Sequence, residues 1–209
     1  METRRIHDIS QPLRPGVPVW PGDTPFGGEQ TWKMAEGSPV NVSKLTLSTH
    51  TGAHADAPLH YAADAPDISS VDLEPFLGEC LVVDARGVGE LVQPEHVPDL
   101  ADARRVLFRT YDRFPHEAWD EAHTAIAPAT IAKLAEYGVL LIGMDGPSLD
   151  PQDSKTMDAH LAVLSADMRV LEGLVLDDVA PGRYELIALP LPIVGGDASP
   201  VRAVLRELA

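Results

Sequence analysis

The stretch Pro128-Ala-Thr-Ile-Ala-Lys-Leu-Ala-Glu-Tyr-Gly138, followed directly by Val139-Leu-Leu-Ile-Gly143, decides the fold. Proline near the beginning and glycine at the end are typical boundaries of a helix. The aliphatic run after Gly138 predicts a strand that is buried on both faces. A helix that leads at once into a buried strand is the arrangement of an α/β layer fold.

Further short apolar runs predict the other elements of this fold. Leu81-Val-Val-Asp84 and Arg105-Val-Leu-Phe-Arg109 have the pattern of central strands. Leu45 and Leu47 alternate with polar residues and predict a half-buried strand. A second short helix is expected from His160. The segment 184–190 is predicted as a late strand, and the segment 201–208 is either a strand or a helix.

The length and composition predict one domain over residues 1–209. Residues 1–40 are rich in proline and glycine, with seven such residues between Pro12 and Pro25, and are expected to form an extended N-terminal arm. The formal net charge of -16 argues against nucleic acid and anionic membranes as partners, because both attract basic proteins. Its simplest interpretation is solubility.

The N-terminus carries two arginines without an apolar stretch behind them, which is not the pattern of a secretory signal. The longest apolar run, residues 138–144, is too short to cross a bilayer. The single cysteine, Cys80, begins an apolar run and is expected to be buried and inert. A cytoplasmic protein is therefore expected.

The strongest chemical signal is the segment His50-Thr-Gly-Ala-His54-Ala-Asp56-Ala-Pro58-Leu-His60. Three of the eight histidines of the chain fall within these eleven residues, together with one aspartate. Imidazole nitrogens and carboxylate oxygens are preferred ligands of zinc and similar divalent ions. A catalytic metal site needs about three such ligands and an open position for water.

The spacing indicates how these ligands converge. In a continuous helix, Asp56 would point away from His50 and His54, whereas extended backbone places residues of even number on one side. Gly52 and Pro58 make an unbroken strand improbable, so we expect His50 to end a strand and a tight loop to bring His54 and Asp56 to the same ion.

Two alternatives to a metal site are weaker. One is a surface loop whose histidines bind nothing. The other is a catalytic triad that uses Ser48, but the chain has no Gly-x-Ser-x-Gly motif. The remaining histidines, His7, His96, His116 and His123, are expected at the surface.

The segment resembles the signature His-x-Gly-Thr-His-x-Asp-Ala-Pro-x-His of the cyclase-like metal-dependent hydrolases, and within them of the kynurenine formamidases, or arylformamidases. It departs from the signature only at Ala53, where the family usually has threonine. Similar segments occur around Trp20, at 143–148 and at 188–202, so the resemblance covers nearly the whole chain. It implies a single-domain, swivelling β/β/α fold with a central mixed sheet or barrel-like core and peripheral helices.

The resemblance also implies a site. Two divalent ions per subunit are expected, Zn²⁺ or alternatively Mn²⁺, with His50, His54 and Asp56 mainly at one and His160 at the other. Asp56 and Glu172 are able to bridge them. His60 is then a general acid/base rather than a ligand, and Trp20 is expected against the aromatic ring of the substrate.

The implied reaction is the hydrolysis of N-formyl-L-kynurenine to L-kynurenine and formate by a metal-activated water, a step of tryptophan degradation. A homodimer is expected, because N-terminal arms of this kind often cross subunit boundaries. Two rival functions keep the site. One is a hydrolase of cyclic amides such as isatin, or a cyclase, and the other is a non-catalytic module that binds metal or ligand.

Overall fold

Four parallel strands form the centre of the protein: β5 (Leu77–Asp84), β7 (Arg105–Arg109), β9 (Leu141–Met144) and β10 (Arg169–Glu172). They are seen in a computed structural model, which describes residues 4–208. Residues 1–3 of the predicted arm and residue 209 therefore lie outside the described part. Every residue of β7 and β9 is buried, as the aliphatic runs predicted.

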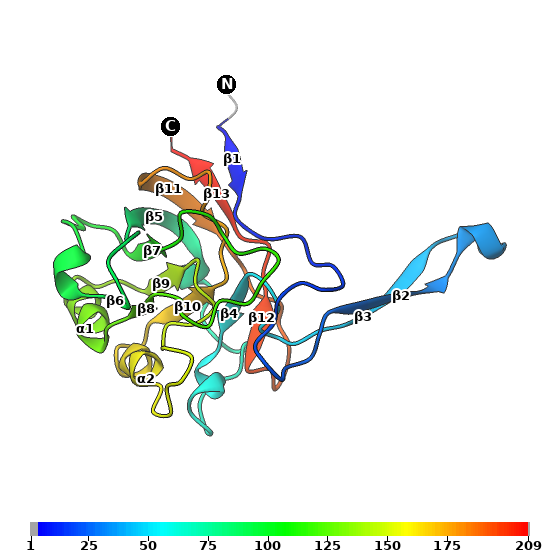
Figure 1. Ribbon diagram of the computed structural model, residues 1–209, viewed down its shortest axis with the longest axis horizontal. Coiled ribbons are helices and arrows are strands. Elements are labelled where there is room, and N and C mark those ends of the chain that lie inside the picture. Colours follow the sequence, from blue (N-terminus) through cyan, green and yellow to red (C-terminus); the bar gives the residue numbers. More distant parts are fainter. Residues whose placement is uncertain (1–3, 209) are drawn as a thin grey trace.

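Antiparallel strands extend this centre on both sides into one curled, mixed sheet of nine strands (Figure 1). Its order is β1-β13-β11-β5-β7-β9-β10-β4-β12. The α/β class and the mixed sheet predicted from the sequence are confirmed. The added strands are β1 (Ile6–Asp8), β4 (His54–Asp56), β11 (Gly182–Ile187), β12 (Ala198–Pro200) and β13 (Val204–Glu207).

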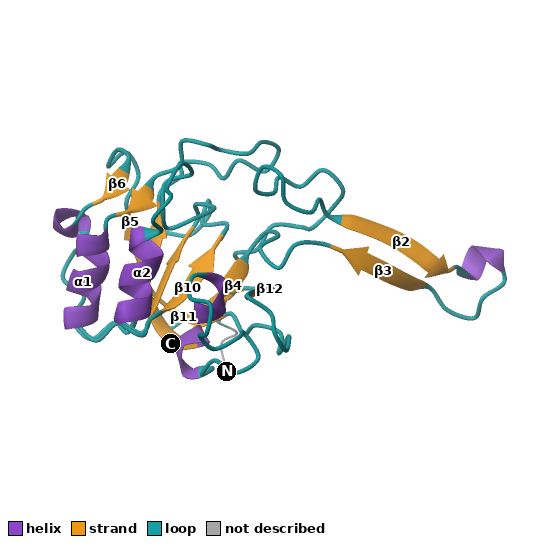
Figure 2. Ribbon diagram, turned by 90° about the horizontal axis from the view of Figure 1, so that it is seen from below, coloured by secondary structure: helices purple, strands orange, loops and turns teal. Residues whose placement is uncertain are grey.

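Helices α1 (Pro128–Glu136) and α2 (Asp158–Ser165) lie side by side on one face of the sheet (Figure 2). Side chains alternate across a strand, so Phe108 packs toward these helices while Leu107 packs into a second apolar cluster on the opposite face. The predicted helix at 128–138 and the short helix from the region of His160 are both confirmed. The segment 201–208 contains strand β13 rather than a helix.

A hairpin projects from the body of the protein (Figures 1 and 2). It consists of β2 (Gly27–Trp32) and β3 (Val42–Thr46), which pair only with each other. The alternation of Leu45 and Leu47 predicted a half-buried strand. A strand is present at Leu45, but the predicted burial is wrong, since all five residues of β3 are exposed and Leu47 lies beyond its end. The period-two pattern describes two faces of the strand, but neither face meets the body.

Two further strands, β6 (Leu91–Val92) and β8 (Ala125–Ile126), form a small parallel pair. Among the described residues no helix is long and apolar enough to cross a membrane. The remaining elements are short 3-10 turns at Met34–Glu36, Pro58–His60, Glu74–Phe76 and Pro94–His96.

Candidate metal centre

Strand β4 carries two of the predicted ligands, His54 and Asp56, and pairs with β10 on one side and β12 on the other. Residues two apart on a strand point to the same side, and Glu172 of β10 lies opposite His54 in the register. The expectation that a loop would carry His54 and Asp56 is therefore wrong. A strand of only three residues exists here because it has a neighbour on each side.

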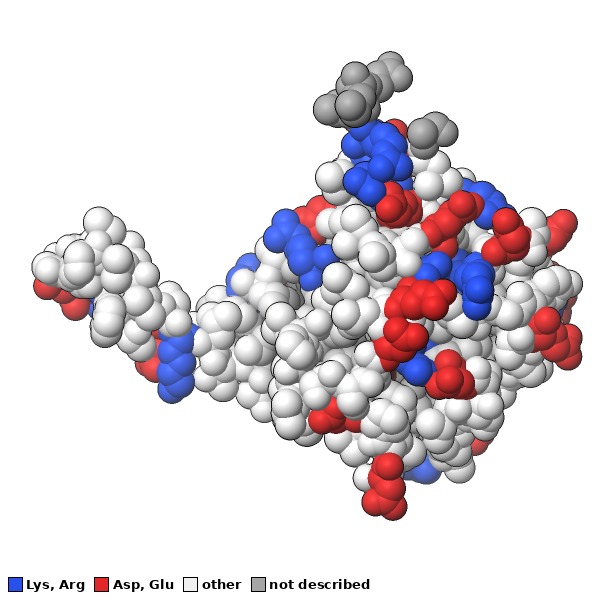
Figure 3. Space-filling view, turned by 180° about the vertical axis from the view of Figure 1, so that it is seen from behind, with Lys and Arg blue, Asp and Glu red and all other residues white. Residues whose placement is uncertain are grey.

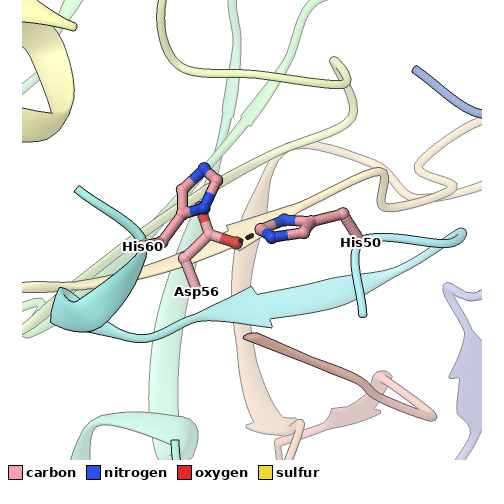
Figure 4. Close-up of side chains that lie close together, drawn as sticks. All are labelled: His50, Asp56 and His60. Atoms are coloured by element: carbon pink, nitrogen blue, oxygen red, sulfur yellow. Dashed lines mark ion pairs between the residues drawn. The ribbon is translucent and has the colours of Figure 1, made fainter. Parts of the chain in front are cut away.

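His50 and His60 approach the Asp56 carboxylate from the segments before and after β4 (Figure 4). His50 lies in a turn, four residues after β3 ends, and so does not end a strand as expected. Its Nδ1 is 3.1 Å from Oδ1 of Asp56, and its Nε2 is 3.1 Å from Oδ2 of Asp197. His60 ends a 3-10 turn, with Nδ1 at 3.5 Å from the same Asp197 oxygen.

Helix α2 and strand β10 bring in the two downstream residues. Nε2 of His160 lies 3.3 Å from Oδ2 of Asp56 and 3.4 Å from Oε1 of Glu172. Nε2 of His54 lies 3.3 Å from Oε2 of Glu172. The structure thus brings together the six side chains that the sequence singled out for metal binding and acid/base chemistry: His50, His54, Asp56, His60, His160 and Glu172.

Hydrogen bonds from the far side of each ring direct two of the histidines into the cluster. Nδ1 of His54 is 2.8 Å from the carbonyl oxygen of Gly52, and Nδ1 of His160 is 2.6 Å from Oδ2 of Asp150. When Nδ1 donates in this way, the neutral ring carries no proton on Nε2, which is then free to coordinate a cation. Oε1 of Glu172 is held in turn by the backbone N–H of Leu149 at 2.7 Å.

The donor set fits a divalent cation. Among the described residues, Nε2 of His54, Nε2 of His160 and both carboxylate oxygens of Asp56 are buried and lack a hydrogen-bond partner. Buried polar atoms are rarely left unpaired in folded proteins. Here these atoms face one another, and a cation would satisfy them together. Asp56 belongs to two groups of ligand atoms that each lie within 4.8 Å: His50, Asp56 and His60, and His54, Asp56 and Glu172.

The charges of the site agree with this interpretation. Burial raises the pKa of Asp56, but the His160 and His50 rings, 3.3 and 3.1 Å from its oxygens, outweigh burial and hold that pKa well below its usual range. Burial lowers the pKa of His50, yet the Asp56 and Asp197 carboxylates raise it to about 9. A proton on His50 therefore balances part of the carboxylate charge, as a metal ion would.

The cluster lies in a cavity of about 600 Å³, a volume typical of small-molecule sites. Trp20, from the segment before the hairpin, lines this cavity with 36% of its surface exposed. Its ring packs edge-on against Trp119, with the ring centroids 5.3 Å apart. The described residues that line the cavity therefore include every member of the cluster except Asp56, together with an aromatic wall.

Sequence reasoning missed two carboxylates of the site. Asp197 contacts His50 and His60, and Asp150 contacts His160. Asp197 lies in a segment that carries the family resemblance, so its chemistry was open to inference, whereas nothing in the spacing of Asp150 marks it. The prediction of a surface position is wrong for His123, which is buried, with Nε2 at 3.0 Å from the carbonyl oxygen of Asp150. Cys80 is buried as predicted, and burial raises its pKa to about 12.

The fold and the donor set define a metal-dependent hydrolase, and the chain belongs to the Cyclase family ("Putative cyclase"), which matches residues 7–151. Within this family the chain is 62% identical, over 205 residues, to the kynurenine formamidase of Erythrobacter litoralis (strain HTCC2594). That similarity covers 98% of this chain and 95% of the relative. The family resemblance found in the sequence is confirmed.

Solved structures share the whole fold. A potential metal-dependent hydrolase with cyclase activity matches with a TM-score of 0.85 and 27% identity, over 99% of this chain and all of the other. Isatin hydrolase A from Labrenzia aggregata matches with a TM-score of 0.83 and 25% identity, over 99% of this chain and 94% of the other. The predicted cyclase-like fold is thereby confirmed.

Proposed function

We propose that this chain is an arylformamidase that hydrolyses N-formyl-L-kynurenine to L-kynurenine and formate. The observation that carries this proposal is the 62% identity to a kynurenine formamidase along nearly the whole chain. The buried cluster beside an aromatic wall supports it, because an aryl formamide needs both a hydrolytic centre and a surface for its ring. The cytoplasm is the compartment that we propose for this activity.

We assign two divalent ions to the site, Zn²⁺ in the first place and Mn²⁺ as the alternative. His50, His54 and Asp56 would hold one ion and His160 the other, with Asp56 and Glu172 between them. The place of Asp56 between the ions is supported by its membership of both groups of ligand atoms and by Nε2 of His160, 3.3 Å from its Oδ2. Ions bound here supply Lewis-acid activation of water and stabilise the developing oxyanion.

His60 is the residue that we assign to proton transfer. Its side chain is 30% exposed and lines the cavity, whereas the side chain of His54 is 4% exposed. His60 accepts a proton from the attacking water and donates it to the anilide nitrogen as the C–N bond breaks. Asp197, 3.5 Å from Nδ1 of His60, holds the ring in place. Trp20 is placed to pack against the aryl ring of the substrate.

Formate release from N-formyl-L-kynurenine, measured before and after chelation and after metal is restored, tests the proposal. We expect turnover that chelation abolishes and metal restores. Isatin belongs in the same assay, because isatin hydrolase A shares the fold at a TM-score of 0.83. Rapid opening of isatin without formate release would replace the proposed substrate, and a metal-loaded protein inert to both would favour a binding module.

A His60→Ala variant tests the proton-transfer role. It should retain its metal and lose turnover by about 10²- to 10⁴-fold, the usual contribution of general acid–base catalysis. Asp56→Ala should instead lower the metal content in elemental analysis. His116→Ala, outside the cluster, is the matched control and should change neither. Full activity in the His60 variant would remove that residue from the mechanism.

We also propose that the chain forms a homodimer through the β2–β3 hairpin. Trp32, Met34 and Leu45 are between 57% and 59% exposed, and an isolated two-stranded hairpin is barely stable in water. Uncharged side chains dominate its visible surface in Figure 3. A second copy of the chain offers a surface to cover them, because apolar surface of this kind marks association sites.

Light scattering during gel filtration tests the dimer. Native protein should elute with the mass of two chains, and a Trp32→Glu, Leu45→Glu double variant should elute with the mass of one. Tyr137→Glu, at an exposed position beyond α1 and away from the hairpin, serves as the control. A hairpin variant that remains dimeric would contradict the assignment.

A further inference from the structure

The cavity has a second chemical feature besides the metal centre. The segment 111–120 supplies Tyr111, Phe114 and Trp119 to the cavity wall, and Trp20 faces Trp119. Asp120 lines the same wall directly after Trp119 and is only partly exposed. A carboxylate among aromatic rings is an arrangement that binds organic cations, through charge and through the faces of the rings.

Hydrogen bonds hold the Asp120 carboxylate in position. Its Oδ2 accepts a hydrogen bond from the Tyr111 hydroxyl at 3.0 Å, and its Oδ1 accepts one from the backbone N–H of Ala122 at 3.0 Å. Burial raises the pKa of Tyr111, so the hydroxyl keeps its proton and remains the donor. Each carboxylate oxygen has a further lone pair, and the group can therefore accept a hydrogen bond from a ligand as well.

The other carboxylates of the cavity, outside the metal centre, are engaged elsewhere. Asp145 is buried and accepts hydrogen bonds from Thr110 and from the backbone of Tyr111. Asp197 pairs with His50, and Asp23 accepts the backbone N–H of the next residue, Thr24. Among the described residues that line the cavity there is no lysine or arginine. Outside the metal centre, the described lining of the cavity thus offers a carboxylate to a cation and no basic side chain to an anion.

We infer that Asp120 recognises the α-ammonium group of an amino-acid substrate, and that the α-carboxylate is left to solvent. The inference rests on the proposed function, in which the formamide and the amino-acid chain occupy adjacent positions on the ring of N-formyl-L-kynurenine, and the α-ammonium group lies at the far end of that chain. With the formamide at the metal centre and the ring against Trp20, the charged end reaches the wall that carries Asp120. Asp120 determines specificity and takes no part in bond breaking.

Two substrate analogues test the inference with the native, metal-loaded enzyme. One lacks the α-amino group of N-formyl-L-kynurenine and keeps the carboxylate, and the other lacks the carboxylate and keeps the amino group. Loss of the amino group should raise KM about tenfold or more, the range of one charge-assisted hydrogen bond. Loss of the carboxylate should change KM less than threefold. The reverse order would overturn the inference.

An Asp120→Asn variant completes the test, with formanilide as a substrate that has no charged end. The variant should raise KM for N-formyl-L-kynurenine about tenfold and leave formanilide hydrolysis within twofold of native. Glu117 is a solvent-exposed residue nearby that pairs with Arg14. Glu117→Gln removes the same charge and should leave KM for both substrates unchanged. Equal effects of Asp120→Asn on both substrates, or none, would overturn the inference. No formate from either substrate with native enzyme would instead refute the proposed function.

Discussion

Gly173, the residue after Glu172, packs tightly against the backbone that holds His54 of the metal centre. Its φ is +65°, and a Cβ built there would lie 2.5 Å from the carbonyl oxygen of Gly52. That carbonyl is the oxygen that holds Nδ1 of His54. Gly173→Ala should therefore displace the backbone before β4, lower the free energy of unfolding by about 2–4 kcal/mol and reduce turnover at least tenfold.

Gly138→Ala is the control for this prediction, because it introduces the strain of a left-handed backbone without a steric contact. Gly138 also has a positive φ, +74°, but a Cβ there meets no described atom within 4 Å. Gly138→Ala should lower the free energy of unfolding by about 1 kcal/mol, the penalty for an L-residue with this backbone conformation, and should leave turnover unchanged. Denaturant unfolding measures the stability of the two glycine variants, and formate release measures their turnover. Equal losses of stability in both variants would contradict the role given to Gly52.

Asp150 is expected to tune the metal affinity through His160. Besides Nδ1 of His160 it accepts the backbone N–H groups of Ala159 and His160, at 2.9 and 3.1 Å, at the beginning of α2. Asp150→Asn places an amide group beside the ring and weakens the orientation of its Nε2. The affinity for one metal ion should fall about 10- to 100-fold, the usual effect of losing such a partner.

Metal retained against graded chelator concentrations measures this affinity, with two ions per chain expected in native protein. Asp153→Asn, on the same loop, is the matched control. An Asp150 variant that keeps both ions as tightly as native protein would contradict the assignment.

The residues of the metal centre show what the sequence can and cannot predict. The cluster from His50 to His60 was found from residue chemistry, because three histidines and an aspartate within eleven residues are rare by chance. His160 and Glu172 were identified only by resemblance to a family. Asp150 was missed, because its role depends on where helix α2 begins: its carboxylate accepts the backbone N–H of Ala159, nine residues further along the chain.

At the scale of elements, helix α2 carries His160 and ends in a strained residue. Asp167 follows the helix with φ +50°, the position where glycine is preferred. Relief of this strain in Asp167→Gly should raise the free energy of unfolding by about 1 kcal/mol. Loss of the ion pair to Arg169 should lower it by only about 0.5 kcal/mol, because the Asp167 side chain is 89% exposed. The net stabilisation expected is about 0.5 kcal/mol.

Asp167→Ala loses the same ion pair without relieving the backbone, and it should destabilise the protein slightly. Denaturant unfolding of the two variants side by side makes the comparison. The prediction is wrong if the alanine variant is the more stable of the two.

The elements also divide into those that local sequence determines and those that the tertiary structure determines. Helix α1 and strands β7 and β9 have strong patterns, and all three were predicted. Strand β4 was not, because its three residues pair on both sides with segments more than a hundred residues away. The predicted burial of strand β3 in the hairpin was wrong. A period-two pattern indicates that a strand has an apolar side, but it does not indicate whether that side contacts the body of the protein or a second chain.

At the scale of the whole molecule, the metal centre joins segments that are far apart in the sequence: the turn at His50, β4, β10 and α2. Two carboxylates, Asp56 and Glu172, are buried there. Burial and the charge of Asp56 both act to raise the pKa of Glu172, although His160 and His54 outweigh them and lower it. A cation removes this repulsion only in the folded state. Bound metal should therefore raise the free energy of unfolding by about 4 kcal/mol when its free concentration is a thousand times Kd.

For a chain of this length, 1 kcal/mol corresponds to about 2–4 °C in Tm, so chelation should lower Tm by about 10 °C and added metal should restore it. Calorimetry of the same sample before chelation, after it and after reconstitution measures the effect. Asp56→Asn is the informative control, since it removes one of the opposed charges together with the ligand that we propose the two ions share. Its Tm should respond little to either treatment. A native Tm that is insensitive to metal would mean that the cluster is held together without a cation, and the two-ion assignment would then fail.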